Sequence, residues 1–140
     1  MGKIAAEWLD EPKRILLWVF EGKWGWVEFY ESMATAHQMI RDAAPDRVDI
    51  VALFVTSPSL PPNAISNIKR ISLQSPENWL LTVIVGAGPF INTMVSIGRR
   101  ANKNLADKYA VADTMEDALR LIDQQRDPQP RKIPVKPTRS

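Results

Sequence analysis

The fold class is decided by the stretch Leu80-Leu81-Thr82-Val83-Ile84-Val85-Gly86-Ala87-Gly88-Pro89-Phe90. An apolar, β-branched run without charge stops at a pair of glycines, and a helical pattern begins at the proline. A strand covered on both faces has this composition, and such strands form parallel sheets flanked by helices. The stretch therefore predicts an α/β domain.

Four other segments also have the composition of strands. The five predicted strands are Ile4–Leu9, Arg14–Glu21, Val48–Val55, Trp79–Val85 and Tyr109–Val111. The first two are joined by the turn-rich residues 10–13 and form an N-terminal hairpin. Because the second strand is almost wholly apolar, we expect it inside the sheet, with the first strand at an edge. The other strands follow one another through helices, which predicts a sheet of about five mostly parallel strands.

Four helices are predicted between and after these strands. From Trp26 to Ala43 apolar residues recur at steps of three and four, the helical period, behind a Gly25 cap with Glu28 in the first turn. A second helix follows Asn63, a good capping residue, and a third runs from about Pro89 to Asn102. The last helix ends at Arg126 and begins after Thr114, which with Asp117 resembles a capping box.

Composition and charge indicate a soluble domain followed by a tail. Residues 1–126 form the predicted domain, and residues 127–140 a flexible tail rich in proline and bases. The tail holds four bases and one acid of a chain with net charge +2, so the domain itself is close to neutral. No basic stripe suggests nucleic-acid binding. The chain has no cysteine, signal peptide or transmembrane stretch, and we expect a cytoplasmic protein without metal or cofactor.

The order of the elements resembles that of STAS domains, and more narrowly of the SpoIIAA-like proteins of bacteria. The resemblance covers about Ile4 to Gln124 and includes Phe20-Glu21-Gly22-Lys23-Trp24-Gly25-Trp26 and Ala112-Asp113-Thr114-Met115-Glu116-Asp117-Ala118. STAS domains carry an Asp-Ser-Ser-Gly-type loop whose serine is phosphorylated and which docks partners. The matching residues 56–63 keep hydroxyl groups but have neither the aspartate nor the glycine. The resemblance therefore implies a docking loop rather than a phosphorylation switch.

Few residues of the chain are suited to catalysis. His37 is the only histidine, and it lies on a predicted helix between Met33 and Ile40 without an evident orienting partner. The pair Gly86 and Gly88 has no third glycine and no lysine to complete a nucleotide-binding motif, so a tight turn is the favoured interpretation. Trp18 is predicted to lie in the core, whereas for Trp24 packing and partner anchoring are both open. We expect no enzymatic activity.

The sequence therefore predicts a regulatory domain that docks a protein partner through the loop and helix after Val48–Val55. The alternative is a module that binds a nucleotide or lipid-like anion at the carboxyl edge of the sheet, where open α/β sheets place their ligands. A homodimer through the edge strand Ile4–Leu9 is also open. The candidate binding residues for either role are Thr56, Ser57, Ser59, Asn63, Gly86, Gly88 and Phe90.

Overall fold

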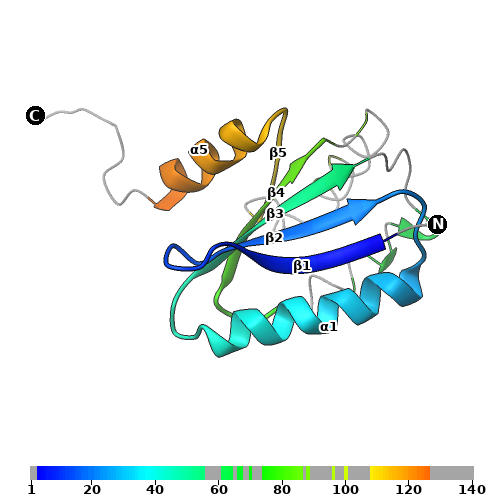
Figure 1. The fold of residues 1–140 in the computed structure, drawn as a ribbon, viewed down its shortest axis with the longest axis horizontal. Coiled ribbons are helices and arrows are strands. Elements are labelled where there is room, and N and C mark those ends of the chain that lie inside the picture. The colour runs from blue at the N-terminus through cyan, green and yellow to red at the C-terminus, as the bar shows by residue number, and fades with distance from the viewer. Residues whose placement is uncertain are drawn as a thin grey trace, which may run out of the picture.

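The computed structural model describes residues 3–55, 61–64, 66–67, 70, 74–86, 88, 96, 100 and 108–126. In chain order, the elements with defined bounds are β1 (Lys3–Asp10), β2 (Ile15–Glu21), α1 (Trp26–Asp42), β3 (Val48–Val55), β4 (Trp79–Val85), β5 (Tyr109–Ala112) and α5 (Met115–Arg126). The strands form one sheet in the order β1-β2-β3-β4-β5 (Figure 1). The predicted α/β class and the five strands are confirmed.

The sheet is mixed, with one antiparallel pair. β1 pairs antiparallel with β2, whereas β2, β3, β4 and β5 run parallel. β1 lies at an edge and β2 inside the sheet, as their compositions predicted. α1, which connects β2 to β3, lies over one face of the sheet (Figure 1). α5 follows the last strand and lies over the other face (Figure 1).

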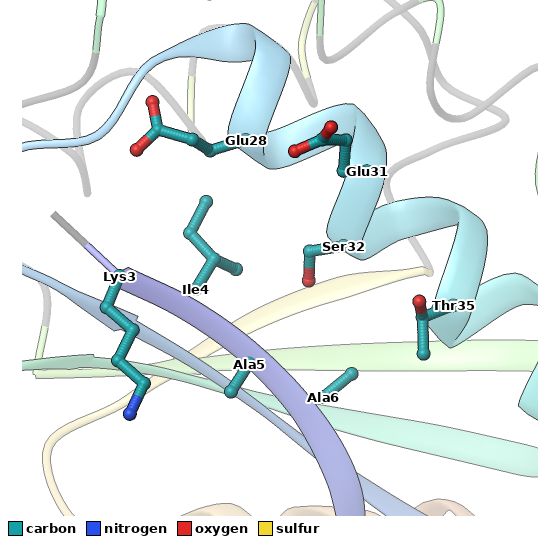
Figure 2. A pocket seen from close by; sticks show the side chains of 8 residues that line it. All are labelled: Lys3, Ile4, Ala5, Ala6, Glu28, Glu31, Ser32 and Thr35. Atoms are coloured by element: carbon teal, nitrogen blue, oxygen red, sulfur yellow. The ribbon is translucent and has the colours of Figure 1, made fainter.

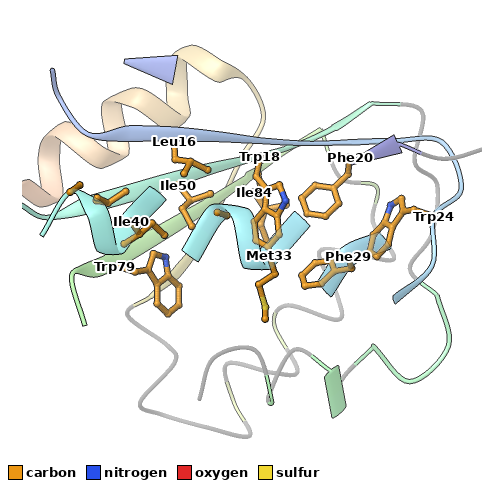
Figure 3. Close-up of a cluster of buried hydrophobic side chains, with 14 residues drawn as sticks. Leu16, Trp18, Phe20, Trp24, Phe29, Met33, Ile40, Ile50, Trp79 and Ile84 are labelled. Carbon is orange, nitrogen blue, oxygen red and sulfur yellow. The ribbon is translucent and has the colours of Figure 1, made fainter. Parts of the chain in front are cut away.

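The two faces of the sheet have cores of different composition. Alternation along β2 sends Leu16, Trp18 and Phe20 toward α1 and Ile15 to the other side. The α1 side is rich in aromatic rings, which Figure 3 shows packed between the sheet and the helix. The α5 side is aliphatic and includes Ala118 and Ile122, both fully buried. The inner strands β3 and β4 are thus covered on both faces, which explains their nearly continuous apolar sequences.

α1 begins where the sequence predicts. Gly25 has an extended backbone, and its N–H donates to the Glu28 carboxylate over 2.8 Å. Trp18 donates its indole N–H to the Ser32 hydroxyl over 2.6 Å, which fixes the helix against the sheet. Trp24, for which two roles were open, is only 6% exposed and packs in the core of the α1 side. The apolar surface of the Trp24 side chain is therefore buried in the core.

α5 is capped as its sequence indicates. The Thr114 hydroxyl accepts a hydrogen bond from the Asp117 N–H over 3.0 Å, the first half of a capping box. The other two predicted helices, one after Asn63 and one from about Pro89 to Asn102, fall mostly on residues outside those described. The tail 127–140 lies outside them as well.

Candidate functional site

The sequence places the candidate site at the carboxyl edge of the parallel strands. Of its seven residues, the structure describes Asn63, Gly86 and Gly88; Thr56, Ser57, Ser59 and Phe90 lie outside the described residues. The Gly22 N–H donates to the Val55 carbonyl over 3.2 Å, so the ends of β2 and β3 are joined there. The described residues therefore define part of this edge.

Gly86 turns the chain sharply at the end of β4. Its φ is 78°, in the left-handed region that favours glycine. A Cβ atom here would lie 2.6 Å from the Phe54 carbonyl oxygen, so the backbones of β3 and β4 approach too closely for a side chain. Gly88 differs, because a Cβ at that position would meet nothing within 4 Å. Gly86 thus has a structural role at this edge, and Gly88 lies beside open space.

Pro62 and Asn67, which lie between β3 and β4 in the chain, are held against the first turns of α1. Trp26 donates its indole N–H to the Pro62 carbonyl over 2.5 Å, and the Tyr30 hydroxyl donates to the Asn67 side-chain oxygen over 2.5 Å. The Asn63 carbonyl accepts hydrogen bonds from the Asn67 backbone and side chain, over 3.1 and 2.9 Å. Asn63 itself has φ 65° rather than the extended backbone usual for a helix cap, a conformation that asparagine tolerates.

Aromatic rings pack against one another at this edge of the sheet. Phe20 at the end of β2 stacks on Phe54 at the end of β3, with ring centroids 4.7 Å apart and planes 8° from parallel. Trp24 meets Trp26 edge-on at 5.5 Å. Val27, next to Trp26 in the sequence, is 75% exposed, the most exposed of the large apolar side chains described. The carboxyl edge therefore has a packed aromatic cluster, and Val27 is the exposed apolar side chain beside it.

His37 lies away from this edge, in the buried face of α1. It is 6% exposed, and burial, with a smaller contribution from the Arg41 charge, lowers its pKa to about 4. Among the described residues none forms a hydrogen bond with the imidazole ring. At neutral pH His37 is thus an uncharged core side chain.

The described residues include neither a cluster of metal ligands nor a membrane-spanning helix. They contain no group of three or more His, Cys, Asp or Glu side chains that could hold a metal ion. Nor does this part of the chain include a helix with the length and apolarity needed to cross a membrane.

A buried ion-pair network at the opposite, amino end of the strands was not predicted. Asp49 is fully buried, and its carboxylate accepts hydrogen bonds from the Nε atoms of Arg47, at 3.0 Å, and Arg126, at 2.6 Å. Arg126 also donates to the carbonyls of Lys13 and Arg14. An acid inside an otherwise apolar strand, with a base two residues before it, was the signal that could have indicated such a pair.

Comparison of the chain with protein-family models, curated proteins and solved structures found no match. The resemblance to STAS domains therefore stays a prediction from sequence.

Proposed function

We propose that this protein is a non-enzymatic, STAS-like interaction domain whose carboxyl edge docks a partner protein. The finer SpoIIAA-like arrangement, with four helices, is part of the proposal, as is a docking surface formed by the loop and helix after β3. The elements α1 and α5 occur where that arrangement requires them. The absence of catalysis is supported by His37, whose burial removes the only imidazole from contact with a substrate.

The attachment of the segment after β3 to α1 carries the proposal. The Trp26–Pro62 and Tyr30–Asn67 hydrogen bonds hold Pro62 and Asn67 against α1, which lowers the ordering cost of a partner that binds beside them. Val27 adjoins Trp26 on the outer side of the helix and is largely exposed. An apolar residue beside a pre-ordered segment is what a protein interface uses at its centre.

Quantitative capture of partners from the native cells tests the proposal. The bait is the tagged full-length chain, compared with Val27→Glu at the carboxyl edge and with Leu9→Glu, a matched control near the amino end of the parallel strands, where Leu9 is 37% exposed. Both variants should keep the wild-type circular dichroism spectrum. Placing a charge in an interface costs more than about 1.4 kcal/mol, so we expect at least about tenfold less partner with Val27→Glu only. Equal capture by all three baits would refute the carboxyl edge as the docking surface.

A further inference from the structure

A groove of about 420 Å³ runs between the edge strand β1 and α1. It is lined by Lys3, Ile4, Ala5, Ala6, Glu28, Glu31, Ser32 and Thr35. Figure 2 shows Ile4 and Ala6 pointing toward the helix, whereas Lys3 and Ala5 point the other way. The groove lies on the flank of α1 opposite to Trp26 and Tyr30, which hold Pro62 and Asn67, and Val27 lies between the two flanks.

The strand side of the groove offers an open hydrogen-bonding edge. β1 pairs with β2 on one side, and its other side carries no strand in the described part of the sheet. Alternate N–H and C=O groups of β1 therefore point outward, and they can pair with an added strand. A register shift between Trp8 and Asp10 interrupts the strand near its end, which leaves residues 3–8 as the regular edge. An extended segment added here would place every second side chain in the groove.

The helix side of the groove is acidic. Glu28 and Glu31 face it together with two hydroxyl side chains (Figure 2). Glu28 already accepts the hydrogen bond from Gly25, whereas Glu31 forms no ion pair with any described residue. A second copy of the chain paired through its own β1 would bring the same two acids opposite these, and like charges repel. The groove therefore suits a basic extended segment better than a second copy.

This chain contains such a segment, and its starting point is known. Arg126 donates to the carbonyls of Lys13 and Arg14, over 2.5 and 3.1 Å, in the turn that follows β1. Residues 127–140 therefore start beside the end of β1. The eight residues of β1 span about 27 Å, and fourteen extended residues reach about 46 Å. The segment is thus long enough to follow the whole strand back to Lys3, in the antiparallel direction.

The sequence of the segment fits an added edge strand. Its four bases are Arg131, Lys132, Lys136 and Arg139. Pro128, Pro130 and Pro134 are an even number of positions apart, so in an extended chain their nitrogens all point to one side, whereas the nitrogen of Pro137 points to the other side and ends the regular strand. Proline is accepted in an edge strand when that side faces solvent. Ile133 and Val135 then direct their N–H groups toward β1.

We propose that residues 127–136 of the C-terminal segment dock along β1 as a sixth, antiparallel strand, which places alternate bases on the face toward Glu28 and Glu31. The docked segment covers the open edge of the sheet, and its removal exposes that edge to other strands. The inference does not rest on the proposed function, since it concerns the other flank of α1 and needs no partner protein.

Paramagnetic relaxation enhancement in the full-length chain tests this docking. The chain has no cysteine, so Thr138→Cys provides a single site for a spin label. We expect the label to cause loss of the amide signals of Ile4, Ala6 and Ser32, but not those of α5 residues such as Ile122. Raising the salt concentration from about 0.1 to about 1 M shortens the screening length from about 10 to about 3 Å and should restore part of these signals.

Charge reversal in the labelled chain supplies the matched control. Glu31→Lys should restore the signals, whereas Glu116→Lys, on the 88% exposed side chain of α5, should leave them attenuated. Mixing spin-labelled chains with isotope-labelled, cysteine-free chains separates docking within one molecule from exchange of tails between two; either result supports the proposal. Signals of β1 and α1 that are unaffected by the label, or a dimer that forms equally well after Glu31→Lys, would overturn it.

Discussion

The two ends of the sheet are held together by different forces. At the amino end a fully buried carboxylate, Asp49, lies between Arg47 and Arg126. At the carboxyl end the described ion pairs lie within α5, between Arg120 and the acids of its first turn, and none joins the strands; there the strands meet through the Phe20–Phe54 stack and through close backbone contact at Gly86. The charged end joins α5 to the start of the sheet, because Arg126 is the last residue of that helix.

This difference indicates that the amino end contributes to stability, whereas the carboxyl end is the better candidate for binding. The groups at the amino end satisfy one another, so they have little capacity left for a ligand. The carboxyl end has three left-handed residues, Gly22, Asn63 and Gly86, which turn the chain sharply away from the strands. Loops at such a strand edge commonly carry binding residues.

Asp49→Ala should have the largest effect, because it breaks the charged end. Removing one partner of a buried ion pair costs about 3–5 kcal/mol. The side chains of Arg47 and Arg126 are 29% and 24% exposed and can regain water, so we expect a loss of about 3–4 kcal/mol. Urea denaturation measures this free energy of unfolding. Asp46→Ala removes a 56% exposed carboxylate paired with Arg14 and should cost less than about 1 kcal/mol. Similar losses for the two variants would contradict the distinct role of the buried carboxylate.

His37 extends the comparison to a buried ionisable group without an ion-pair partner in the described residues. Its pKa falls from 6.5 to about 4 on folding, so the unfolded chain binds more protons between these values. The stabilisation is complete above pH 6.5 and is lost as the pH falls through about 4, to a total of about 3 kcal/mol.

His37→Leu should remove that part of the pH dependence. Urea denaturation at several pH values between 7 and about 4 compares the two chains, and the carboxyl groups that both share cancel in the difference. We expect the wild type to lose about 3 kcal/mol more than the variant over this range. Parallel curves for the two chains would show that His37 stays accessible to protons in the folded state.

The fold was largely predictable because its signals are local. The uncharged run in β4 and the three-and-four spacing in α1 each follow from how a short segment is buried. Capping residues also act within one turn, and Glu28 and Thr114 both hydrogen-bond as their sequence positions indicate. Periodicity within each segment was therefore sufficient to place these elements.

The sites were less predictable because they depend on residues far apart in the sequence. Asp49 and Arg126 are separated by 77 positions, and nothing near Arg126 indicates that a buried acid requires it. The groove beside β1 exists only when Ile4 and Glu31 are brought onto neighbouring elements. Asn63 was predicted from its side chain as a cap, but its backbone conformation depends on how the chain leaves β3. Such features arise from tertiary packing, which residue patterns along one segment do not encode.

Gly86→Ala probes the carboxyl end and should have the smallest of these effects. The new Cβ would lie 2.6 Å from the Phe54 carbonyl oxygen at a φ of 78°, so the ends of β3 and β4 must separate slightly. Left-handed strain and this contact together should lower the free energy of unfolding by about 2 kcal/mol. Gly88→Ala is the matched control, because its Cβ would meet nothing within 4 Å. If both variants were as stable as the wild type, close packing at Gly86 would not be what holds the carboxyl end together, and the stacked aromatic rings would have to supply that stability.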